Sequence, residues 1–529
     1  MTGPRPSLLL VLAVVTRGDS LGLATADREW VGDPAELTSS RLVLWSAAAT
    51  RLLPLRPRQV WDLAAVHKVL YGGRRDDPSA VWAAAHGLPV PTRPGEDLAL
   101  LDVALSVVEG YVEPVRADGS LHPDAARQTA PERWAGLALQ VQRLQQEALL
   151  SLPDPRRELS GPPLRLVTAW AESAAAVLCT ELEADGLPFD EVEARRLLTA
   201  TLGEHDDRAV RDAPVLALFR GDDVDLRNPL SVRDALLRLG IEVPDTRSWR
   251  LEAYRRAHPV VDALLTWRKA ERVSTTYGYS WMAQHVSGGR LRGEWTAADG
   301  GAGRMTASAG LHSLPAELRP AVAAEPGHLL VRADLGQVEP RVLAAVSGDT
   351  AFARAAAADD LYTPVAAALG CDRPTAKVAV LAAMYGQTSG AAGQALRQMD
   401  AAYPVALAYL RAAEEAGRVG TDVRTHGGRL VRTGTGGVGR YARNAVVQGA
   451  AAELFKAWAA AVRNGLAGGR VVLCLHDELL LHVPAGEAQA AVALLHDALQ
   501  EVSGHWASGS GVRFVADVAV VRRWSEAKG

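Results

Sequence analysis

Cysteine, lysine and phenylalanine are scarce in this chain of 529 residues, which has three, five and five of them. The cysteines, Cys179, Cys371 and Cys474, lie far apart, which excludes a disulfide framework and a cysteine-rich zinc site. This usage is typical of a reducing compartment, so we expect a cytoplasmic protein. The net charge is only −4, which excludes an overall positive field, so any contact with a polyanion must be local.

Long hydrophobic runs are also missing, so we expect no membrane partner. The apolar run Leu8–Val15 would suit a signal peptide, but it is short and no clear cleavage site follows it. We therefore predict a first β-strand there. Apolar residues make up 48% of the chain and charged residues 22%, as in globular enzymes, and the length predicts two to four domains.

Proline and glycine gather in Leu152–Leu164, which we predict to be a linker between two parts of the chain. Trp295–Gly310 is rich in small residues and is predicted to be flexible and polar. Apolar residues at helical spacing predict long helices at Pro131–Leu150, Val167–Asp185 and Arg440–Arg463, and mostly helical structure over 200–285 and 350–415.

Two apolar strands are each predicted to end in a carboxylate. Leu329–Val346 leads from a strand into a helix and has Asp334 at the change, while the apolar stretch from Val471 ends at Asp477. Carboxylates on neighbouring strands can converge on hard cations, and two such cations about 4 Å apart assist phosphoryl transfer. Either aspartate alone would more often end a strand or cap a helix, but the pair favours a metal site.

A helix is predicted within Gly370–Gly390, with Asp372 as its N-cap and Pro374 in its first turn. Two cations, an apolar residue and an aromatic residue then recur every four positions and share one face: Arg373, Lys377, Leu381 and Tyr385. That face would suit a nucleoside triphosphate, with the cations at the phosphates. The alternative is a solvated basic end of a core helix. Because lysine is so rare here, a retained lysine favours the phosphate role.

These motifs, in this order, resemble the catalytic motifs of family-A DNA polymerases, the bacterial DNA polymerase I type. Ala333–Asp349 resembles the first motif, Arg373–Gly386 the nucleotide-binding helix of the fingers, and Leu475–Pro484 the third motif. Weaker matches add the thumb-to-palm helix, the template-side segment and the palm helix: Thr266–Trp281, Gly303-Arg304 with the following LHSLP, and Arg440–Lys456. The resemblance covers roughly residues 165–529.

The resemblance implies an α+β right-hand polymerase preceded by an α/β ribonuclease H-like domain of the 3′–5′ exonuclease type. The expected domains are 1–155 for the exonuclease-like part and 165–529 for the polymerase, with the thumb at about 185–290, the palm at about 291–350 and 430–529, and the fingers at about 351–429. The implied reaction is DNA-templated addition of dNTPs to a primer 3′ end with two Mg²⁺ ions, for which Mn²⁺ can substitute. We expect a monomer that acts on primer–template DNA, associated with the nucleoid.

Site residues follow from the resemblance, position by position. The implied metal and catalytic residues are Asp334, Leu335, Lys377, Asp477 and Glu478. The implied nucleotide contacts are Arg373, Lys377, Leu381, Tyr385, Gln337, Tyr362 and Glu339, the last excluding a 2′-hydroxyl. The implied DNA contacts are Arg304, Arg440, Asn444, Gln448, His476 and Thr276. The resemblance also predicts that His476, Asp477 and Glu478 form a hairpin tip in the palm.

Several positions depart from the family pattern, although no metal ligand is lost: Leu335, Gly336, Pro340, Tyr362, Leu381, His482 and Leu311-His312-Ser313. These departures suggest a specialised repair or gap-filling polymerase. At the places where a proofreading site has its carboxylates, the N-terminal part offers only Asp19, Asp76 and Asp77, so we expect the exonuclease shape without its activity. The resemblance leaves no room for a 5′-nuclease domain. Two alternatives stay open, a polymerase with a rearranged exonuclease site and a non-catalytic protein that binds DNA ends.

Overall fold

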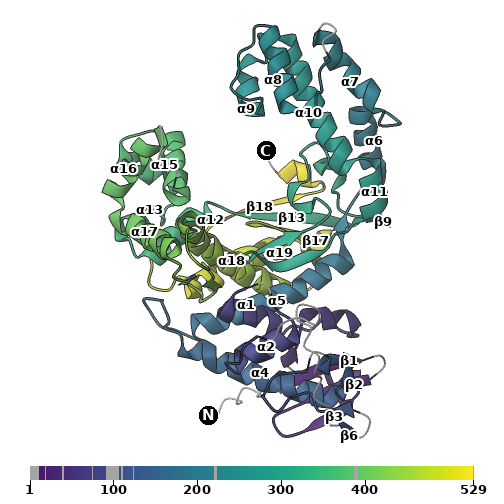
Figure 1. The fold of residues 1–529 in the computed structure, drawn as a ribbon, viewed down its shortest axis with the longest axis vertical. Coiled ribbons are helices and arrows are strands. Elements are labelled where there is room, and N and C mark those ends of the chain that lie inside the picture. The colour runs from purple at the N-terminus through teal and green to yellow at the C-terminus, as the bar shows by residue number, and fades with distance from the viewer. Residues whose placement is uncertain are drawn as a thin grey trace. The chain divides into compact units, whose positions relative to one another are not determined.

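The structure is a computed structural model that describes residues 11–527, apart from 18–19, 38–40, 74, 91–106, 109–110, 123, 220–222 and 387–390. Asp19 and Leu8–Leu10, which carry predictions, therefore lie outside the described residues. The chain divides into two compact units (Figure 1). The first comprises residues 1–184, 295–306 and 331–519, and the second 185–294, 307–330 and 520–529. Among the described helices, none has the length and apolarity needed to cross a membrane.

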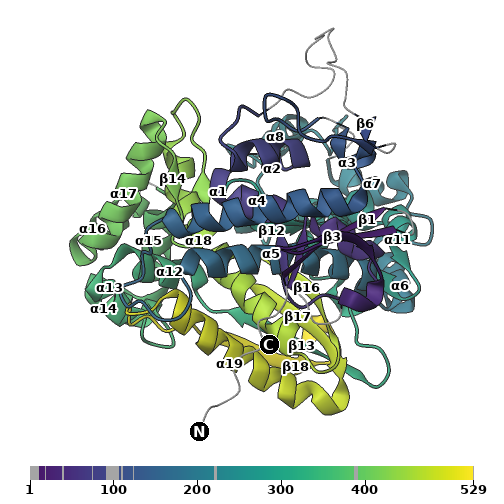
Figure 2. The same ribbon diagram turned by 90° about the horizontal axis from the view of Figure 1, so that it is seen from below.

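The N-terminal part of the first unit is built on a mixed five-stranded sheet with the strand order β3-β2-β1-β4-β5. The strands are β1 (Val11–Arg17), β2 (Ser20–Ala24), β3 (Glu29–Gly32), β4 (Arg41–Leu44) and β5 (Val60–Asp62). The predicted first strand is confirmed from Val11 onward, and β1 pairs antiparallel with β2 and parallel with β4. Helix α4 (Pro131–Ser151) packs across β1, β2 and β3 (Figure 2), so its apolar face and the sheet form one core.

The predicted linker contains neither helix nor strand over residues 152–163, and α5 (Leu164–Asp185) follows it. One buried guanidinium holds this segment in place. Arg156 donates to the Asp154 carboxylate at 2.9 Å and to the carbonyl oxygens of Ser160 at 2.8 Å and Pro162 at 3.1 Å. Because these bonds lie in a buried site, the connection is a fixed element of the fold.

A four-stranded sheet with the order β16-β17-β13-β18 forms the centre of the C-terminal half. The strands are β13 (His328–Leu335), β16 (Arg470–Leu475), β17 (Glu478–Pro484) and β18 (Ala516–Val521). The long helix α18 (Gly439–Gly465), predicted from the sequence, and α19 (Ala488–Trp506) lie beside this sheet (Figure 1). The prediction of a flexible segment at Trp295–Gly310 is wrong, because these residues form the paired strands β11 (Trp295–Asp299) and β12 (Arg304–Ala307).

Helices make up the segment between β13 and α18. They are α12 (Val338–Ser347), α13 (Thr350–Ala355), α14 (Tyr362–Leu369), α15 (Arg373–Tyr385), α16 (Ala391–Ala402) and α17 (Pro404–Val419). The predicted start of α15 is confirmed, since the Asp372 side chain accepts a hydrogen bond from the Thr375 N–H at 2.9 Å. Gly386 ends this helix with a φ of 66°, a conformation that glycine adopts without steric cost. A small hairpin, β14 (Val423–Arg424) and β15 (Leu430–Val431), follows α17.

The second unit is mainly helical, as the sequence predicts for residues 200–285. Its main helices are α6 (Glu191–Leu202), α7 (Arg208–Leu216), α8 (Pro229–Arg238), α10 (Pro259–Tyr277) and α11 (Tyr279–His285). Apolar residues of α7, α8 and α10 form one core, which includes Val215, Leu236 and Leu264. Thr276, a predicted DNA contact, is exposed on α10.

A buried ionic cluster joins α5 to α18 inside the first unit. Lys456 Nζ lies 2.9 and 2.8 Å from the two carboxylate oxygens of Glu172, and Arg429 Nη2 lies 2.6 Å from Glu172 Oε2. Lys456 is 0% exposed. Burial opposes the charge on Glu172, but Arg429 and Lys456 outweigh it and lower the pKa of that carboxyl group. Burial lowers the pKa of Lys456 to about 8.

Replacing Glu172 with alanine should lower the unfolding free energy by about 3–5 kcal/mol, because two buried cations lose their counter-ion. Urea denaturation followed by tryptophan fluorescence measures this. Glu415→Ala is the matched control, since Glu415 pairs with Arg418 at 2.6 Å but the two side chains are 58% and 66% exposed. The control should change stability by less than about 0.5 kcal/mol. Similar losses in both variants would contradict the role given to the buried cluster.

Candidate functional site

The predicted hairpin tip is confirmed. Leu475 at the end of β16 pairs with Glu478 at the start of β17, which leaves His476 and Asp477 as a two-residue turn. His476 has a φ of 53°, as short hairpin turns require at one or both positions. His476 is exposed, Asp477 is half-buried and Glu478 is buried. The turn thus directs polar groups outward from two buried strands.

Asp334 and Asp477 meet where β13 lies next to this hairpin. The Leu335 N–H donates to the Asp477 carbonyl oxygen at 2.9 Å, which fixes the two strand ends against each other. Burial raises the pKa of Asp477 to about 6, and the nearby charge of Asp334 adds to this effect. Two hard oxygen donors whose charges destabilise each other are the donor set that suits a divalent cation. The residues therefore fit the predicted metal site.

Arg332, two residues before Asp334, is a member of this site that the sequence analysis missed. Its Nη2 donates to Asp334 Oδ2 and, at 2.9 Å, to Glu478 Oε2. The side chain is 3% exposed. The sequence did contain a sign of this role. Arg332 stands within the apolar run LLVRAD, and a charged side chain that faces the interior there needs an acidic partner.

Glu339 connects three segments of the first unit. It accepts hydrogen bonds from Arg304 of β12 and, at 2.9 Å, from the hydroxyl of Tyr385 at the end of α15. Burial raises the pKa of Tyr385 to about 12, and the Glu339 charge adds to the shift. Tyr385 therefore keeps its proton and acts as a hydrogen-bond donor at neutral pH.

A cavity of about 340 Å³ lies between these groups. Seven predicted site residues line it: Arg304, Gln337, Glu339, Tyr385, Gln448, His476 and Asp477. Residues that the sequence analysis did not select also line it: Met305, Val338, Pro340, Ala451, Ala452, Phe455 and Lys456. Most of these additional residues are apolar, so their position could not be distinguished from ordinary core packing by sequence alone.

The predicted phosphate-binding face of α15 is exposed at its start. Arg373 pairs with Asp360 at 2.8 Å, and its side chain lies 5.6 Å from the ring centre of Tyr362. Hydrogen bonds from Arg373 lower the pKa of Asp360. Lys377 is exposed.

The remaining predicted nucleotide contacts are less exposed to solvent than Arg373 and Lys377. Leu381 is half-buried and Tyr362 is buried. The Gln337 side chain donates to Asp360 at 2.5 Å and accepts from the Leu361 N–H at 2.8 Å, so it fixes the start of α14. It also lies at a φ of 56°, in the left-handed region.

Three predicted DNA contacts lie four residues apart on α18 and therefore on one face. Arg440 is exposed, while Asn444 and Gln448 are half-buried. The Asn444 Oδ1 atom is buried without a hydrogen-bond partner, which is uncommon in a folded protein.

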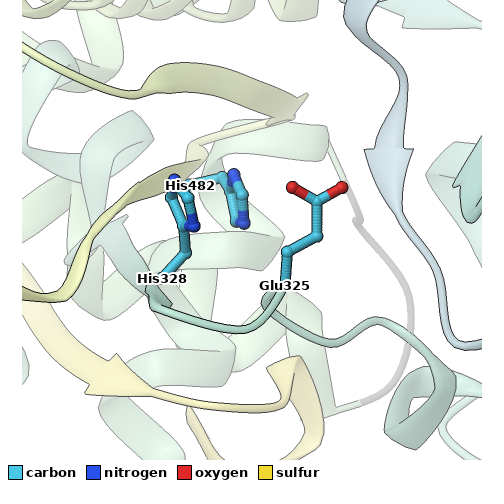
Figure 3. A group of neighbouring side chains, drawn as sticks. All are labelled: Glu325, His328 and His482. Atoms are coloured by element: carbon cyan, nitrogen blue, oxygen red, sulfur yellow. The ribbon is translucent and has the colours of Figure 1, made fainter.

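His482, one of the departures from the family pattern, lies far from the hairpin tip. It pairs with Arg470 at the open end of the β16–β17 hairpin and is buried. Figure 3 shows His482 on β17, and Glu325 and His328 on the segment that leads into and begins β13. Residue 482 is therefore not part of the turn with His476 and Asp477.

Sequence comparison now places these features in a family. A family model described as DNA polymerase family A matches residues 238–526, more than half of the chain. The chain belongs to DNA polymerase family A. This family A chain is 31% identical to the thermostable DNA polymerase I of Thermus filiformis over 323 residues, which are 54% of this chain and 38% of that protein. It is 29% identical to DNA polymerase I of Chloroflexus aurantiacus over 297 residues, 48% of this chain and 31% of that protein.

A solved structure shares the fold over nearly the full length. The POL domain of Pol1 from M. smegmatis, in complex with DNA primer-template and dNTP, has a TM-score of 0.69 and 19% identity, covering 98% of this chain and 96% of that chain. The predicted family and the right-hand polymerase fold are thus confirmed. The matches cover less than half the length of the curated relatives reported above.

Asp477→Asn should stabilise the fold at pH 8 by about 1–2 kcal/mol and by less at pH 5. The pKa of Asp477 is about 6 in the folded chain, against 3.8 for an ordinary aspartate. Its contribution to stability is therefore fully present below pH 3.8 and is lost as the pH rises through 6. Partial exposure reduces the effect below the full value of the shift.

Urea denaturation at both pH values, with a chelator present, measures this difference. Asp497→Asn, at an exposed position of α19, is the control and should change little at either pH. A destabilised Asp477→Asn at pH 8, or an equal gain at both pH values, would contradict the electrostatic account.

Proposed function

We propose that this chain is a DNA-templated DNA polymerase that adds dNTPs to a primer 3′ end. The observation that carries the proposal is the meeting of Asp334 and Asp477 at two strand ends beside the 340 Å³ cavity that Glu339 and Tyr385 line. In-line phosphoryl transfer needs charge neutralisation and positioning more than covalent chemistry, and this arrangement offers both.

Asp334 and Asp477, with Leu335 beside them, would hold two Mg²⁺ ions, for which Mn²⁺ can substitute. When bound, these ions supply positive charge to the attacking and leaving oxygens. The protein residues hold the reactants around that point. Glu478 supports the aspartates through the shared Arg332, and His476 at the exposed turn faces the primer end.

The nucleotide contacts come from α15 and the segment before it. Arg373 and Lys377 bind the triphosphate, and Tyr385 and Leu381 lie at the insertion site. Glu339, held by the Tyr385 hydroxyl, excludes a 2′-hydroxyl. Gln337 and Tyr362 are the remaining nucleotide contacts. Each phosphate contact to a cation is charge-assisted. The pairing of Arg373 with Asp360 holds the guanidinium near the start of α15.

The DNA contacts in the first unit come from β12, α18 and the turn with His476, and that in the second unit from α10. Arg304, Arg440, Asn444 and Gln448 contact the nascent base pair and template, and Thr276 contacts the DNA from α10. We propose a monomer that acts in the cytoplasm on nucleoid DNA, in repair or gap filling.

We further propose that residues 1–155 are an exonuclease-like domain that supports the polymerase and does not proofread. Three arginines of the later chain bind carbonyl oxygens of this part. Arg463 donates to Pro57 at 2.8 Å, while Arg424 and Arg432 donate to Leu70 at 3.0 Å and Tyr71 at 2.8 Å. Leu70 and Tyr71 end α1 (Leu63–Tyr71), where helix carbonyls lack partners and attract cations.

Three acids of this part are engaged in local structure. Asp62 accepts from the Ala47 and Ala65 N–H groups at 2.6 and 2.8 Å. Asp76 pairs with Lys68 at 2.6 Å, and Asp77 pairs with Arg75 and caps α2 (Pro78–Ala85). Among the described residues before position 156, no three His, Cys, Asp or Glu ligand atoms lie within 4.8 Å of one another. Two-metal hydrolysis needs such a cluster.

Primer extension with Mg²⁺ and separate dNTPs tests the polymerase proposal. The wild-type chain should add the nucleotide complementary to the template, and Asp334→Ala and Asp477→Ala should each lose on the order of a thousandfold in rate. Fluorescence anisotropy should show that both variants still bind the primer–template. Asp497→Ala on the exposed face of α19 is the matched control and should extend normally. DNA binding without extension by the wild-type chain would favour a non-catalytic DNA-end binding protein.

A labelled primer with a 3′ mismatch, incubated with Mg²⁺ or Mn²⁺ and no dNTP, tests the loss of proofreading. The primer should keep its length, because the acids of the N-terminal part are bound to backbone amides and basic side chains. Shortening that disappears in Asp62→Asn or in an Asp76→Asn/Asp77→Asn double variant would instead show an active, rearranged exonuclease site.

A further inference from the structure

Arg332 occupies an unusual place among the carboxylates of the catalytic site. A single nitrogen, Nη2, bonds both Asp334 Oδ2 and Glu478 Oε2, and Nη1 lies 3.6 Å from Asp517 Oδ2. The third nitrogen, Nε, is buried without a hydrogen-bond partner. A guanidinium that served packing alone would satisfy its donors more fully. The geometry instead places its charge between two acids.

The charge on Arg332 is permanent. A guanidinium stays protonated across the whole pH range in which proteins fold. It therefore cancels one of the three negative charges of Asp334, Asp477 and Glu478. It also engages one oxygen of Asp334 that a divalent cation would otherwise contact. A fixed cation and a divalent ion close to the same carboxylate repel each other, and in a partly buried site the repulsion is weakly screened.

We propose that Arg332 is a positioning residue that acts as a covalently attached counter-ion of the carboxylate cluster and lowers its affinity for free divalent cations. It keeps Asp334 and Glu478 assembled by charge, and it directs Glu478 toward the guanidinium and away from metal coordination. This inference rests on the proposed function only in taking Asp334 as a metal ligand.

The test is a Mn²⁺ titration of the full-length chain, without DNA or nucleotide, followed by the electron paramagnetic resonance of free Mn²⁺. Four variants accompany the wild type: Arg332→Met, Arg332→Gln, Arg332→Lys and Asp334→Ala. The two neutral variants should bind Mn²⁺ on the order of tenfold more tightly. Arg332→Lys keeps the charge and should stay near the wild type. Asp334→Ala should remove the site and so identify it.

Thermal unfolding gives a second readout. The neutral variants should unfold at a lower temperature than the wild type with a chelator present, and Mn²⁺ should raise their Tm by more than it raises that of the wild type. Arg332→Gln, which can still donate to Glu478, keeps the test available if Arg332→Met does not fold.

Three results would overturn the inference. The first is an unchanged or weaker Mn²⁺ affinity in a folded neutral variant. The second is a gain in Mn²⁺ affinity in Arg332→Lys that equals the gain in the neutral variants. The third is that neither the wild type nor any Arg332 variant has a Mn²⁺ site that Asp334→Ala removes. A lower Tm without a change in Mn²⁺ affinity would show a purely structural role. Primer extension by the wild type decides the proposed function separately, so the two can fail independently.

Discussion

Carboxylates held close together repel one another, and the first unit is arranged around that constraint. The backbone hydrogen bond from the Leu335 N–H to the Asp477 carbonyl oxygen holds the segments that carry Asp334 and Asp477 against each other, which limits how far the two carboxylates can separate. Burial and the charge of Asp334 raise the pKa of Asp477 to about 6. The site is thus costly to fold, as is common where function needs a strained arrangement of charges. The positive charge of Arg332 reduces the repulsion between the carboxylates, and a bound cation would reduce it further.

Rigid surroundings make such an arrangement possible. The strands β16 and β17 on either side of the turn with Asp477 are buried, and α18 packs beside the sheet that they form with β13. The Glu172–Lys456–Arg429 cluster then fixes α18 to α5, which begins directly after the connection held by Arg156. Because Lys456 also lines the 340 Å³ cavity, the same buried pair connects α5 to the candidate site.

Much of this could be predicted from the sequence, because the relevant signals are local. The Asp372 cap and the long helix at α18 follow from spacing and residue type, and the hairpin turn at His476 follows from the family resemblance. Arg332 could not be placed in this way, since its burial depends on Glu478, which is 146 positions away. The β11–β12 pair was also missed, because small residues there suggest a flexible loop until strand pairing is known. The partners of Glu339 likewise come from segments distant in sequence.

A crystal structure of the chain with primer–template DNA, a non-hydrolysable dNTP analogue and Mn²⁺ tests the central claim most directly. Anomalous scattering locates Mn²⁺ without reference to activity. The account predicts two peaks about 4 Å apart, in contact with carboxylate oxygens of Asp334 and Asp477, with the triphosphate beside them and the primer end near His476. Ordered DNA and nucleotide with no Mn²⁺ at these aspartates, or Mn²⁺ bound elsewhere in the chain, would contradict it.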